Sequence, residues 1–160
     1  MTTPLYRITS DKYLNVLNGQ GASFKSGARW NPPGSEAIYM GVSAAGAMLE
    51  MGNYIPLPSL VPDDYVMGIF SIPSQYIDTY DITKLPVGWD EYPHSHITQE
   101  IGKEWLDSHS NVCIRFPSCT VPSGLESIVL INPNHPDINK LQLIDKIKFN
   151  YHERLFNGLR

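Results

Sequence analysis

A proline- and glycine-rich turn, a short strand and a helix follow one another within residues 27–51, and this stretch limits the possible folds more than any other. The turn contains a large aromatic residue, Trp30, and a permanent cation, Arg29. The run over residues 36–42 predicts a short strand, and Ser43 is a typical N-cap for the helix that follows. The stretch therefore predicts a tightly connected turn–strand–helix unit.

The predicted strand places a tyrosine beside open space. Side chains alternate along a strand, so Ile38 and Met40 share one face and Tyr39 lies on the other. Ala37 and Gly41 are the neighbours of Tyr39 on its face, and both are small. We therefore expect open space beside the tyrosine ring.

The predicted helix adds a carboxylate to the same region. Glu50 lies at the edge of the apolar stripe, and Gly46, one turn earlier on that edge, has no side chain. Arg29, Tyr39 and Glu50 are thus expected to border one hollow. Each also has an ordinary explanation, because carboxylates on helix flanks and arginines in turns are mostly solvated, while strand tyrosines mostly pack in the core. The stripe consists of Ala44, Ala47, Met48 and Met51.

The composition indicates one ordinary soluble domain. The chain has 160 residues, of which 42% are hydrophobic and 18% charged, and this is enough for a single core. Its formal net charge of −4 argues against a protein that holds nucleic acid or an anionic membrane through a basic face. No apolar run approaches ~18 residues, and residues 1–4 do not look like the start of a secretory signal. We expect Cys113 and Cys119 to be reduced, which suits a cytoplasmic protein.

Elsewhere the predicted elements do not follow a regular β–α–β order. We expect strands over residues 6–8, 65–72, 112–116 and 127–131, and a last strand or bent strand pair over 141–149. We expect helices over 10–18 (capped by Ser10) and 98–109 (capped by Thr98), and irregular chain over 19–26, 55–64 and 73–93. The strands outnumber the helices and the connections are short, which favours an α+β domain over a doubly wound sheet. No repeat or linker divides the chain, so residues 1–160 are expected to form a single domain.

The common catalytic and binding motifs are missing from the sequence. There is no Gly-x-Gly-x-x-Gly, no Walker-type Gly-Lys-Ser and no Gly-x-Ser-x-Gly elbow. His94 and His96 form the one close histidine pair, and no third ligand stands nearby in sequence, so we do not expect a metal site. His135, between an asparagine and a proline, is more typical of a rigid turn than of a catalytic base.

Several motifs together resemble the signature of the RES-domain family, which is named for Arg, Glu and Ser and supplies the toxins of bacterial toxin–antitoxin pairs. The motifs occur in the family's order and span nearly the whole chain. The matching residues are Gly27, Arg29, Trp30, Asn31, Pro32 and Gly34 in the turn, Tyr39 on the strand, Leu49 and Glu50 on the helix, Pro117 and Ser118, the run from Asn132 to Asp137, and also Leu5 to Ile8, Leu85 to Trp89, Arg154 and Leu155.

The resemblance implies a fold similar to that of ADP-ribosyltransferases, with a mixed or antiparallel β core and a few flanking helices. It also implies chemistry on NAD, which is a substrate here and not a cofactor. Cleavage of the nicotinamide–ribose bond leaves an oxocarbenium-like cation, and the resemblance assigns Glu50 to its stabilisation. Arg29 is the implied clamp for the pyrophosphate. Tyr39 would stack on nicotinamide or bond to Glu50, and Ser118 would orient Glu50 or a ribose hydroxyl.

Further residues are implied for NAD binding. Arg7 and Lys25 are candidates for additional phosphate contacts, and Trp30 joins Arg29 and Tyr39 as a candidate for binding NAD.

Two serines are candidates for the signature serine of the family. Ser118 follows a predicted strand and a proline, and is preferred to Ser123, which follows Val121 and Pro122. Without the resemblance, Ser118 would be a strand-end hydroxyl that bonds to its own backbone. Because Glu50 precedes the serine, unlike in many ADP-ribosyltransferases, the roles carry over as a set of residue types and not by chain order.

The implied function is that of a toxin that depletes NAD. The acceptor of the ADP-ribose is water, as in a glycohydrolase, or inorganic phosphate, as in a phosphorolase. Two alternatives stay open, namely a mono-ADP-ribosyltransferase that modifies a host-cell protein and a non-catalytic NAD-binding module. The resemblance also implies a partner, an antitoxin with an Xre-like helix-turn-helix domain that blocks the active site. That complex, and not this acidic chain alone, would contact DNA.

Overall fold

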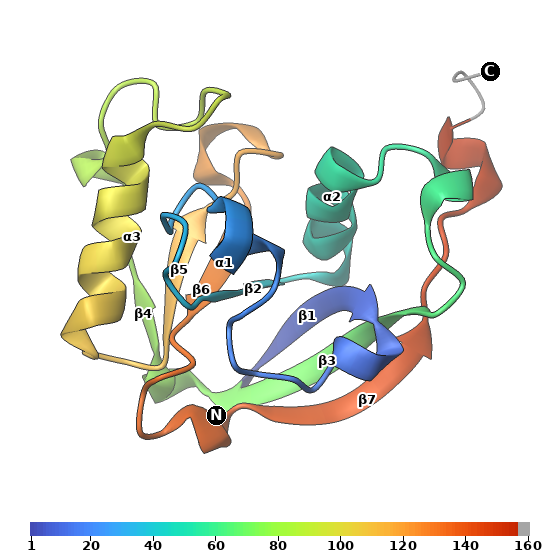
Figure 1. The fold of residues 1–160 in the computed structure, drawn as a ribbon, viewed down its shortest axis with the longest axis horizontal. Coiled ribbons are helices and arrows are strands. Elements are labelled where there is room, and N and C mark those ends of the chain that lie inside the picture. The colour runs from blue at the N-terminus through green and yellow to red at the C-terminus, as the bar shows by residue number, and fades with distance from the viewer. Residues whose placement is uncertain (157–160) are drawn as a thin grey trace.

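The computed structural model describes residues 1–156, which contain seven strands and three α-helices (Figure 1). The strands are β1 (Thr2–Ser10), β2 (Ile38–Gly41), β3 (Tyr65–Pro73), β4 (Ile77–Thr79), β5 (Cys113–Pro117), β6 (Ser127–Ile131) and β7 (Gln142–Lys148). The helices are α1 (Ala22–Ser26), α2 (Ala44–Tyr54) and α3 (His96–Ser108). Short 3₁₀ turns lie at Asp11–Tyr13, Pro58–Leu60, Ser74–Tyr76, Ile82–Lys84, Pro122–Gly124, Ile138–Lys140 and Glu153–Phe156.

The seven strands form one mixed sheet in the order β4-β5-β6-β2-β1-β3-β7. All neighbours are antiparallel except β4 and β5, which are parallel. β1 and β2 are joined at a single pair, Tyr6 opposite Gly41, so the sheet divides there into two halves. In Figure 1 the strands β1, β3 and β7 run in a clearly different direction from β5 and β6. The predicted α+β class with a mixed sheet is therefore confirmed.

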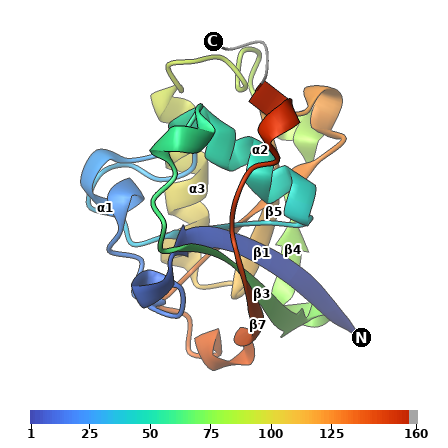
Figure 2. The ribbon, with the colours of Figure 1, turned by 90° about the vertical axis from the view of Figure 1, so that its right-hand side faces the viewer.

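α2 lies where the two halves of the sheet meet. Figure 2 shows it above β1, with α3 on the far side of the molecule. The N-cap prediction is confirmed, because the Ser43 hydroxyl accepts a hydrogen bond from the Gly46 N–H at 2.9 Å. The same hydroxyl donates to Glu126 Oε2 at 2.8 Å, which ties the start of α2 to the chain that enters β6.

α3 covers one face of the β4–β5–β6–β2 half, over a core of aromatic and aliphatic side chains. Trp30 is fully buried there and stacks on Phe116, with 3.9 Å between ring centroids and 8° between planes. Gly102 brings the helix against the backbone of Trp30, since a Cβ at this position would lie 1.7 Å from the Trp30 carbonyl oxygen. This contact fixes the turn that carries Arg29.

The predicted alternation on β2 is confirmed. Ile38 and Met40 belong to the core cluster that also contains Leu5 and Phe70, whereas Tyr39 packs against the Trp30 cluster on the other face. The strands predicted over 65–72, 112–116, 127–131 and 141–149 also form, each within about a residue of its predicted ends.

The predicted helix over residues 10–18 is wrong. Only a 3₁₀ turn forms there, and the Ser10 hydroxyl donates to Asp64 instead of capping a helix. The start of α3 is also corrected, because Ser95 is its cap and Thr98 is a buried residue whose hydroxyl donates to the Ser95 carbonyl oxygen at 2.8 Å. The short α1 and β4 lie within segments predicted to be irregular.

No helix within residues 1–156 is long and apolar enough to cross a membrane.

Candidate active site

Glu50 and Ser118 meet between α2 and the end of β5. The Ser118 hydroxyl donates to Glu50 Oε1 at 2.5 Å, and its oxygen accepts from the Thr120 N–H at 3.1 Å. Ser118 is 2% exposed, and its N–H donates to the Glu126 carbonyl oxygen at 2.9 Å. A buried hydroxyl held in this way fixes the carboxylate of Glu50 in one orientation. Ser123, the competing serine, is exposed on the 3₁₀ turn that follows, and Ser118 is the one placed against Glu50.

Arg29 holds a loop with one edge of its guanidinium. Its Nη1 donates to the carbonyl oxygens of Trp89 at 2.6 Å and Glu91 at 3.0 Å. Both hydrogens of Nη1 are used by these bonds, and the guanidinium also lies within hydrogen-bond reach of the Cys119 thiol. An anion would therefore meet Arg29 through Nε and Nη2.

The charges of Arg29 and Glu50 both act on Cys119. Burial raises the pKa of the Cys119 thiol, while the positive charge of Arg29 lowers it and the negative charge of Glu50 raises it. Cys119 directly follows Ser118. Both cysteines are free, as predicted.

Tyr39 uses its hydroxyl to hold the turn that contains Arg29. The hydroxyl donates to Asn31 Oδ1 at 2.5 Å and accepts from the Trp30 N–H at 3.3 Å. Asn31 is fully buried, and its amide donates to the Ser23 carbonyl oxygen at 2.9 Å. Burial also raises the pKa of Tyr39 strongly, so the phenol stays protonated. The expected bond from Tyr39 to Glu50 is not formed, because Asn31 takes the proton of the hydroxyl.

The other residues expected to bind NAD are Trp30, Arg7 and Lys25. Trp30 has no exposed surface, so the expected contact between Trp30 and NAD does not fit this structure, in which the ring supports the turn from the core. Arg7 Nη1 donates to the carbonyl oxygens of Leu14 at 3.0 Å and Val16 at 3.2 Å, and burial lowers the pKa of Arg7. Lys25 is exposed on α1.

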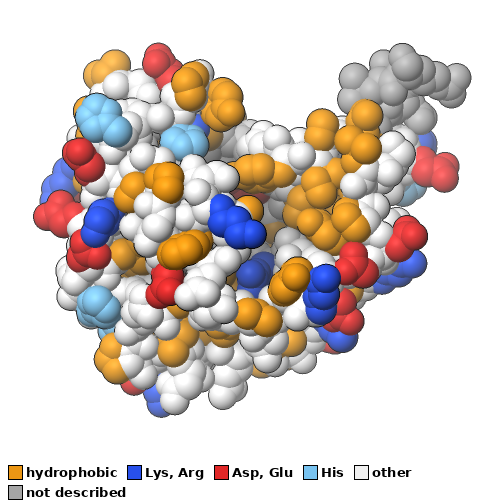
Figure 3. Space-filling view, viewed as in Figure 1, with side chains coloured by type: hydrophobic (Ala, Val, Ile, Leu, Met, Phe, Trp, Pro, Cys, Tyr) orange, Lys and Arg blue, Asp and Glu red, His pale blue; other side chains and the backbone are white. Residues whose placement is uncertain are grey.

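The surface is hollowed between the part of the molecule that carries α3 and the part that carries α2 (Figure 3). Glu50 and Tyr54 lie on the α2 side, and Arg29 and the loop that it holds lie on the α3 side. The charges of Glu50 and Arg29 both reach Tyr54, since burial raises the pKa of Tyr54, Glu50 raises it further and Arg29 lowers it. The structure thus brings Arg29, Tyr39, Glu50 and Ser118 into one region, although they come from four separate elements.

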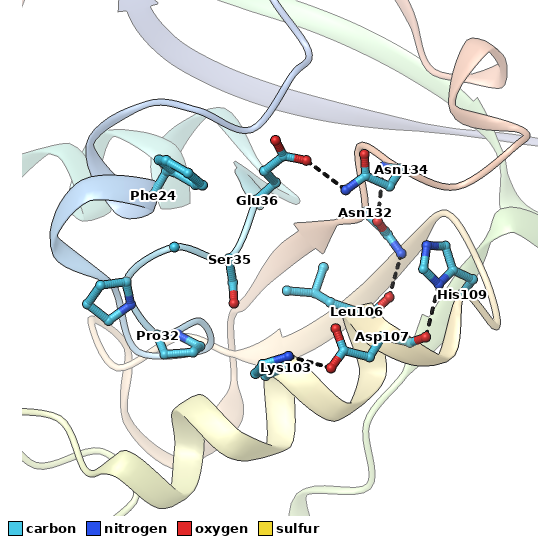
Figure 4. Close-up of a pocket in the computed structure, with 12 residues that line it drawn as sticks. Phe24, Pro32, Ser35, Glu36, Lys103, Leu106, Asp107, His109, Asn132 and Asn134 are labelled. Carbon is cyan, nitrogen blue, oxygen red and sulfur yellow. Dashed lines mark hydrogen bonds and ion pairs between the residues drawn. The ribbon is translucent and has the colours of Figure 1, made fainter.

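A second hollow, of about 520 Å³, lies away from these residues (Figure 4). It is bordered by the turn after Trp30, the end of α3 and the segment after β6. Its polar rim includes the bond from the Asn134 amide to Glu36 at 2.8 Å and the ion pair between Lys103 and Asp107. None of the residues expected to act on NAD lines it.

Within residues 1–156, no group of three or more His, Cys, Asp or Glu side chains lies close enough together to hold a metal ion. His94 lies in the loop before α3 and His96 is the first residue of that helix, so the pair does not share a strand face.

Three residues that support the site received no role from the sequence. Asn31 stands inside the turn motif, and its complete burial is visible only in the fold. Thr120 is two residues after Ser118, a spacing at which side chains often bond to the backbone nearby. Glu126 anchors Ser43 from 83 residues away, and no local pattern reveals such a contact.

Comparison with solved structures identifies the class of the fold. Over the whole chain, the fold matches a chain in the crystal structure of the M. tuberculosis MbcT–MbcA toxin–antitoxin complex, with a TM-score of 0.72, 19% identity and coverage of 90% of that chain. At this identity the likeness concerns the fold, an α+β domain built on a divided mixed sheet.

The sequence identifies the family. Residues 4–152 match the RES domain, and the chain belongs to the RES-domain family. It is 33% identical over 153 residues to Toxin Res of Photorhabdus laumondii, covering 94% of this chain and 96% of the relative. It is 31% identical over 161 residues to the Prs ADP-ribosylating toxin of Sphingobium sp., covering 97% and 98% of the two chains.

Proposed function

We propose that this protein is the toxin of a bacterial toxin–antitoxin pair and that it depletes NAD by cleaving the bond between nicotinamide and ribose. The observation that carries the proposal is the Glu50 carboxylate, held by the buried Ser118 hydroxyl at 2.5 Å, next to Cys119, on which the charge of Arg29 also acts. The toxin role is supported by the family and by the names of its relatives.

Glu50 would act on the ribose carbon. Its Oε1 accepts from Ser118, and no other hydrogen bond to the carboxylate is found in the described part of the chain, which leaves Oε2 for the reaction. As the bond from C1 of the ribose to the nicotinamide nitrogen breaks, its electron pair leaves with nicotinamide and positive charge develops on the sugar. A fixed carboxylate stabilises that charge without having to reorganise. It then accepts a hydrogen bond or the proton from the incoming oxygen nucleophile.

Arg29 would hold the pyrophosphate. A planar guanidinium matches two phosphate oxygens, and only Nη1 of Arg29 bonds to the loop, so Nε and Nη2 would meet the pyrophosphate. Tyr39 would offer its ring face to nicotinamide, since its hydroxyl is already used by Asn31.

The acceptor of the ADP-ribose is water or inorganic phosphate in this proposal. A second candidate, transfer of ADP-ribose to a protein, is favoured by one specific observation. The relative that is 31% identical over nearly the whole chain is named an ADP-ribosylating toxin. The same Glu50 would then orient a nucleophile from the target protein.

The proposal includes an antitoxin that covers the hollow and prevents turnover. It is supported by the fold's likeness to a chain from a toxin–antitoxin complex. We propose that this antitoxin carries an Xre-like helix-turn-helix domain, as the family resemblance implies. Because NAD is an intracellular metabolite, the proposed site of action is the cytoplasm.

The test follows nicotinamide release from NAD by chromatography, with and without phosphate, for the wild type, Glu50→Gln and a matched control, Glu104→Ala, on the exposed face of α3. We expect release by the wild type and the control and its loss in Glu50→Gln. Free ADP-ribose identifies water as the acceptor, ADP-ribose 1″-phosphate identifies phosphate, and label on a protein identifies the transferase. NAD binding without release in any condition would contradict the proposal and favour a non-catalytic module.

A further inference from the structure

Two exposed tyrosines stand on the elements at the two sides of the hollow, namely the end of α2 and the loop that Arg29 holds. Tyr54 is 76% exposed at the end of α2, and Tyr92 is 86% exposed in the loop before α3. Neither is needed to fill a core at such exposure. Single exposed aromatic side chains are common on protein surfaces, and these two are distinguished by the residues beside them, Glu50 for Tyr54 and the Arg29-held backbone for Tyr92.

Tyr54 lies one helical turn beyond Glu50. Residues four apart on a helix share a face, so Tyr54 extends the face of α2 that carries the carboxylate toward the solvent. Although most of the ring is exposed, partial desolvation by the surrounding protein is the largest cause that raises the pKa of Tyr54. Glu50 raises this pKa further, Arg29 lowers it and Tyr92 raises it. The hydroxyl of Tyr54 is therefore within electrostatic reach of both charged site residues and of the second tyrosine.

Tyr92 is positioned by Arg29 through the backbone. The guanidinium holds the carbonyl oxygens of Trp89 and Glu91, and Tyr92 is the next residue. Its ring also meets the His94 ring edge-on, with 6.3 Å between centroids and 71° between planes. Tyr92 thus stands next to the backbone that Arg29 holds, and its own ring is mostly solvated.

We infer that Tyr54 and Tyr92 bind the adenine ring of NAD between them, outside Arg29. The inference rests on the proposed function, which places the nicotinamide ribose at Glu50 and the pyrophosphate at Arg29. A dinucleotide laid in this direction would carry its adenine ring past Arg29, between the end of α2 and the loop before α3, where Tyr54 and Tyr92 stand. Aromatic rings stack on a base through its π-face, and exposed tyrosines keep that face free.

Binding is measured in the Glu50→Gln background, so that turnover does not consume the ligand. Calorimetry gives Kd for NAD and for nicotinamide mononucleotide, which lacks the adenosine half. We expect Tyr54→Leu and Tyr92→Leu each to weaken NAD binding about tenfold and to leave the binding of the mononucleotide unchanged. Phenylalanine at either position should restore NAD affinity, because the ring and not the hydroxyl makes the contact.

Tyr13→Leu is the matched control, since Tyr13 is 53% exposed on the 3₁₀ turn after β1 and belongs to neither wall of the hollow. Equal losses for NAD and the mononucleotide would overturn the inference in favour of a nicotinamide contact, and unchanged Kd values for both would overturn it outright. The proposed function fails separately, if wild-type protein binds NAD and releases no nicotinamide.

Discussion

The Ser118 hydroxyl donates to Glu50 Oε1 at 2.5 Å, although the two residues are 68 positions apart in the chain. Ser118 directly follows β5 and Glu50 comes from the second turn of α2, so the bond closes the junction between the sheet and the helix. Its oxygen is held in turn by the Thr120 N–H. The carboxylate is consequently fixed before any substrate arrives, which is the condition for electrostatic stabilisation of a developing cation.

Replacing Ser118 by alanine removes the donor and lets Glu50 rotate. A hydrogen bond to a charged group is worth about 1.5–3 kcal/mol, so we expect nicotinamide release to fall on the order of 10- to 100-fold in kcat, with KM for NAD little changed. Steady-state kinetics measure this. Ser123→Ala is the control and should retain full activity, because Ser123 is exposed on the neighbouring turn. A larger loss in Ser123→Ala than in Ser118→Ala would reverse the assignment of the serine.

Arg29→Lys keeps the positive charge and loses the planar fork. A lysine cannot hold the carbonyl oxygens of Trp89 and Glu91 and at the same time clamp a pyrophosphate in two places. We expect KM for NAD to rise about tenfold or more and the amides around residues 89–92 to exchange hydrogen faster. Kinetics combined with hydrogen exchange read both effects. Exchange rates that stay at the wild-type level would show that the loop does not depend on Arg29.

Local patterns predicted the parts of this fold whose cause is local. The alternation of Ile38, Tyr39 and Met40 on β2 follows from the strand period, and the Ser43 cap follows from its own hydroxyl. β4 was not predicted because three residues pair with β5 from a distance of 36 positions, and nothing local distinguishes them from a loop. The Ser10 error has the same origin, since its hydroxyl is taken by Asp64 far along the chain.

The candidate site was predictable as a set of residues and less so as a set of contacts. The family resemblance named Glu50 and Ser118, and the fold brings them together. It also named Trp30, whose ring the fold places in the core. An aromatic residue next to a site arginine can face the ligand or support the turn from inside, and only tertiary packing decides between these outcomes. Tyr39 shows the same limit, because its partner Asn31 lies on a different element.

Tyr39→Phe removes a buried hydrogen bond and leaves the Asn31 carbonyl oxygen without its donor. Asn31 is fully buried, so water cannot replace the phenol, and we expect a loss of about 1–3 kcal/mol in the free energy of unfolding. Urea denaturation followed by tryptophan fluorescence gives this value. Tyr13→Phe, at an exposed site, is the control and should leave the midpoint unchanged. Equal midpoints for both variants would mean that the Tyr39 bond contributes nothing to stability.

Stability should fall in alkaline solution. Burial raises the pKa of Tyr39 and that of Cys113, so in the folded protein both groups keep their protons at a pH where the unfolded chain releases them. The stability that these two protonated groups contribute is complete at a pH below their pKa values in the unfolded chain, about 8.5 for the thiol and about 10 for the phenol. It is lost as the pH rises toward their raised pKa values in the folded protein. The urea midpoint should therefore decline from about pH 8.5 upward. In Tyr39→Phe the decline above about pH 10 should be shallower. Identical slopes for the two proteins would contradict the role of Tyr39.

Gly102→Ala tests the contact that positions the Arg29 turn from below. A Cβ at this position would lie 1.7 Å from the Trp30 carbonyl oxygen, so α3 must move away from the turn. We expect a loss of about 3 kcal/mol or more in the free energy of unfolding, together with reduced nicotinamide release, because Arg29 directly precedes Trp30. Gly21→Ala is the control, since a Cβ there meets nothing within 4 Å and its stability should stay within about 1 kcal/mol of the wild type. If Gly102→Ala unfolds at the wild-type urea concentration, α3 does not press on the turn as closely as this contact requires.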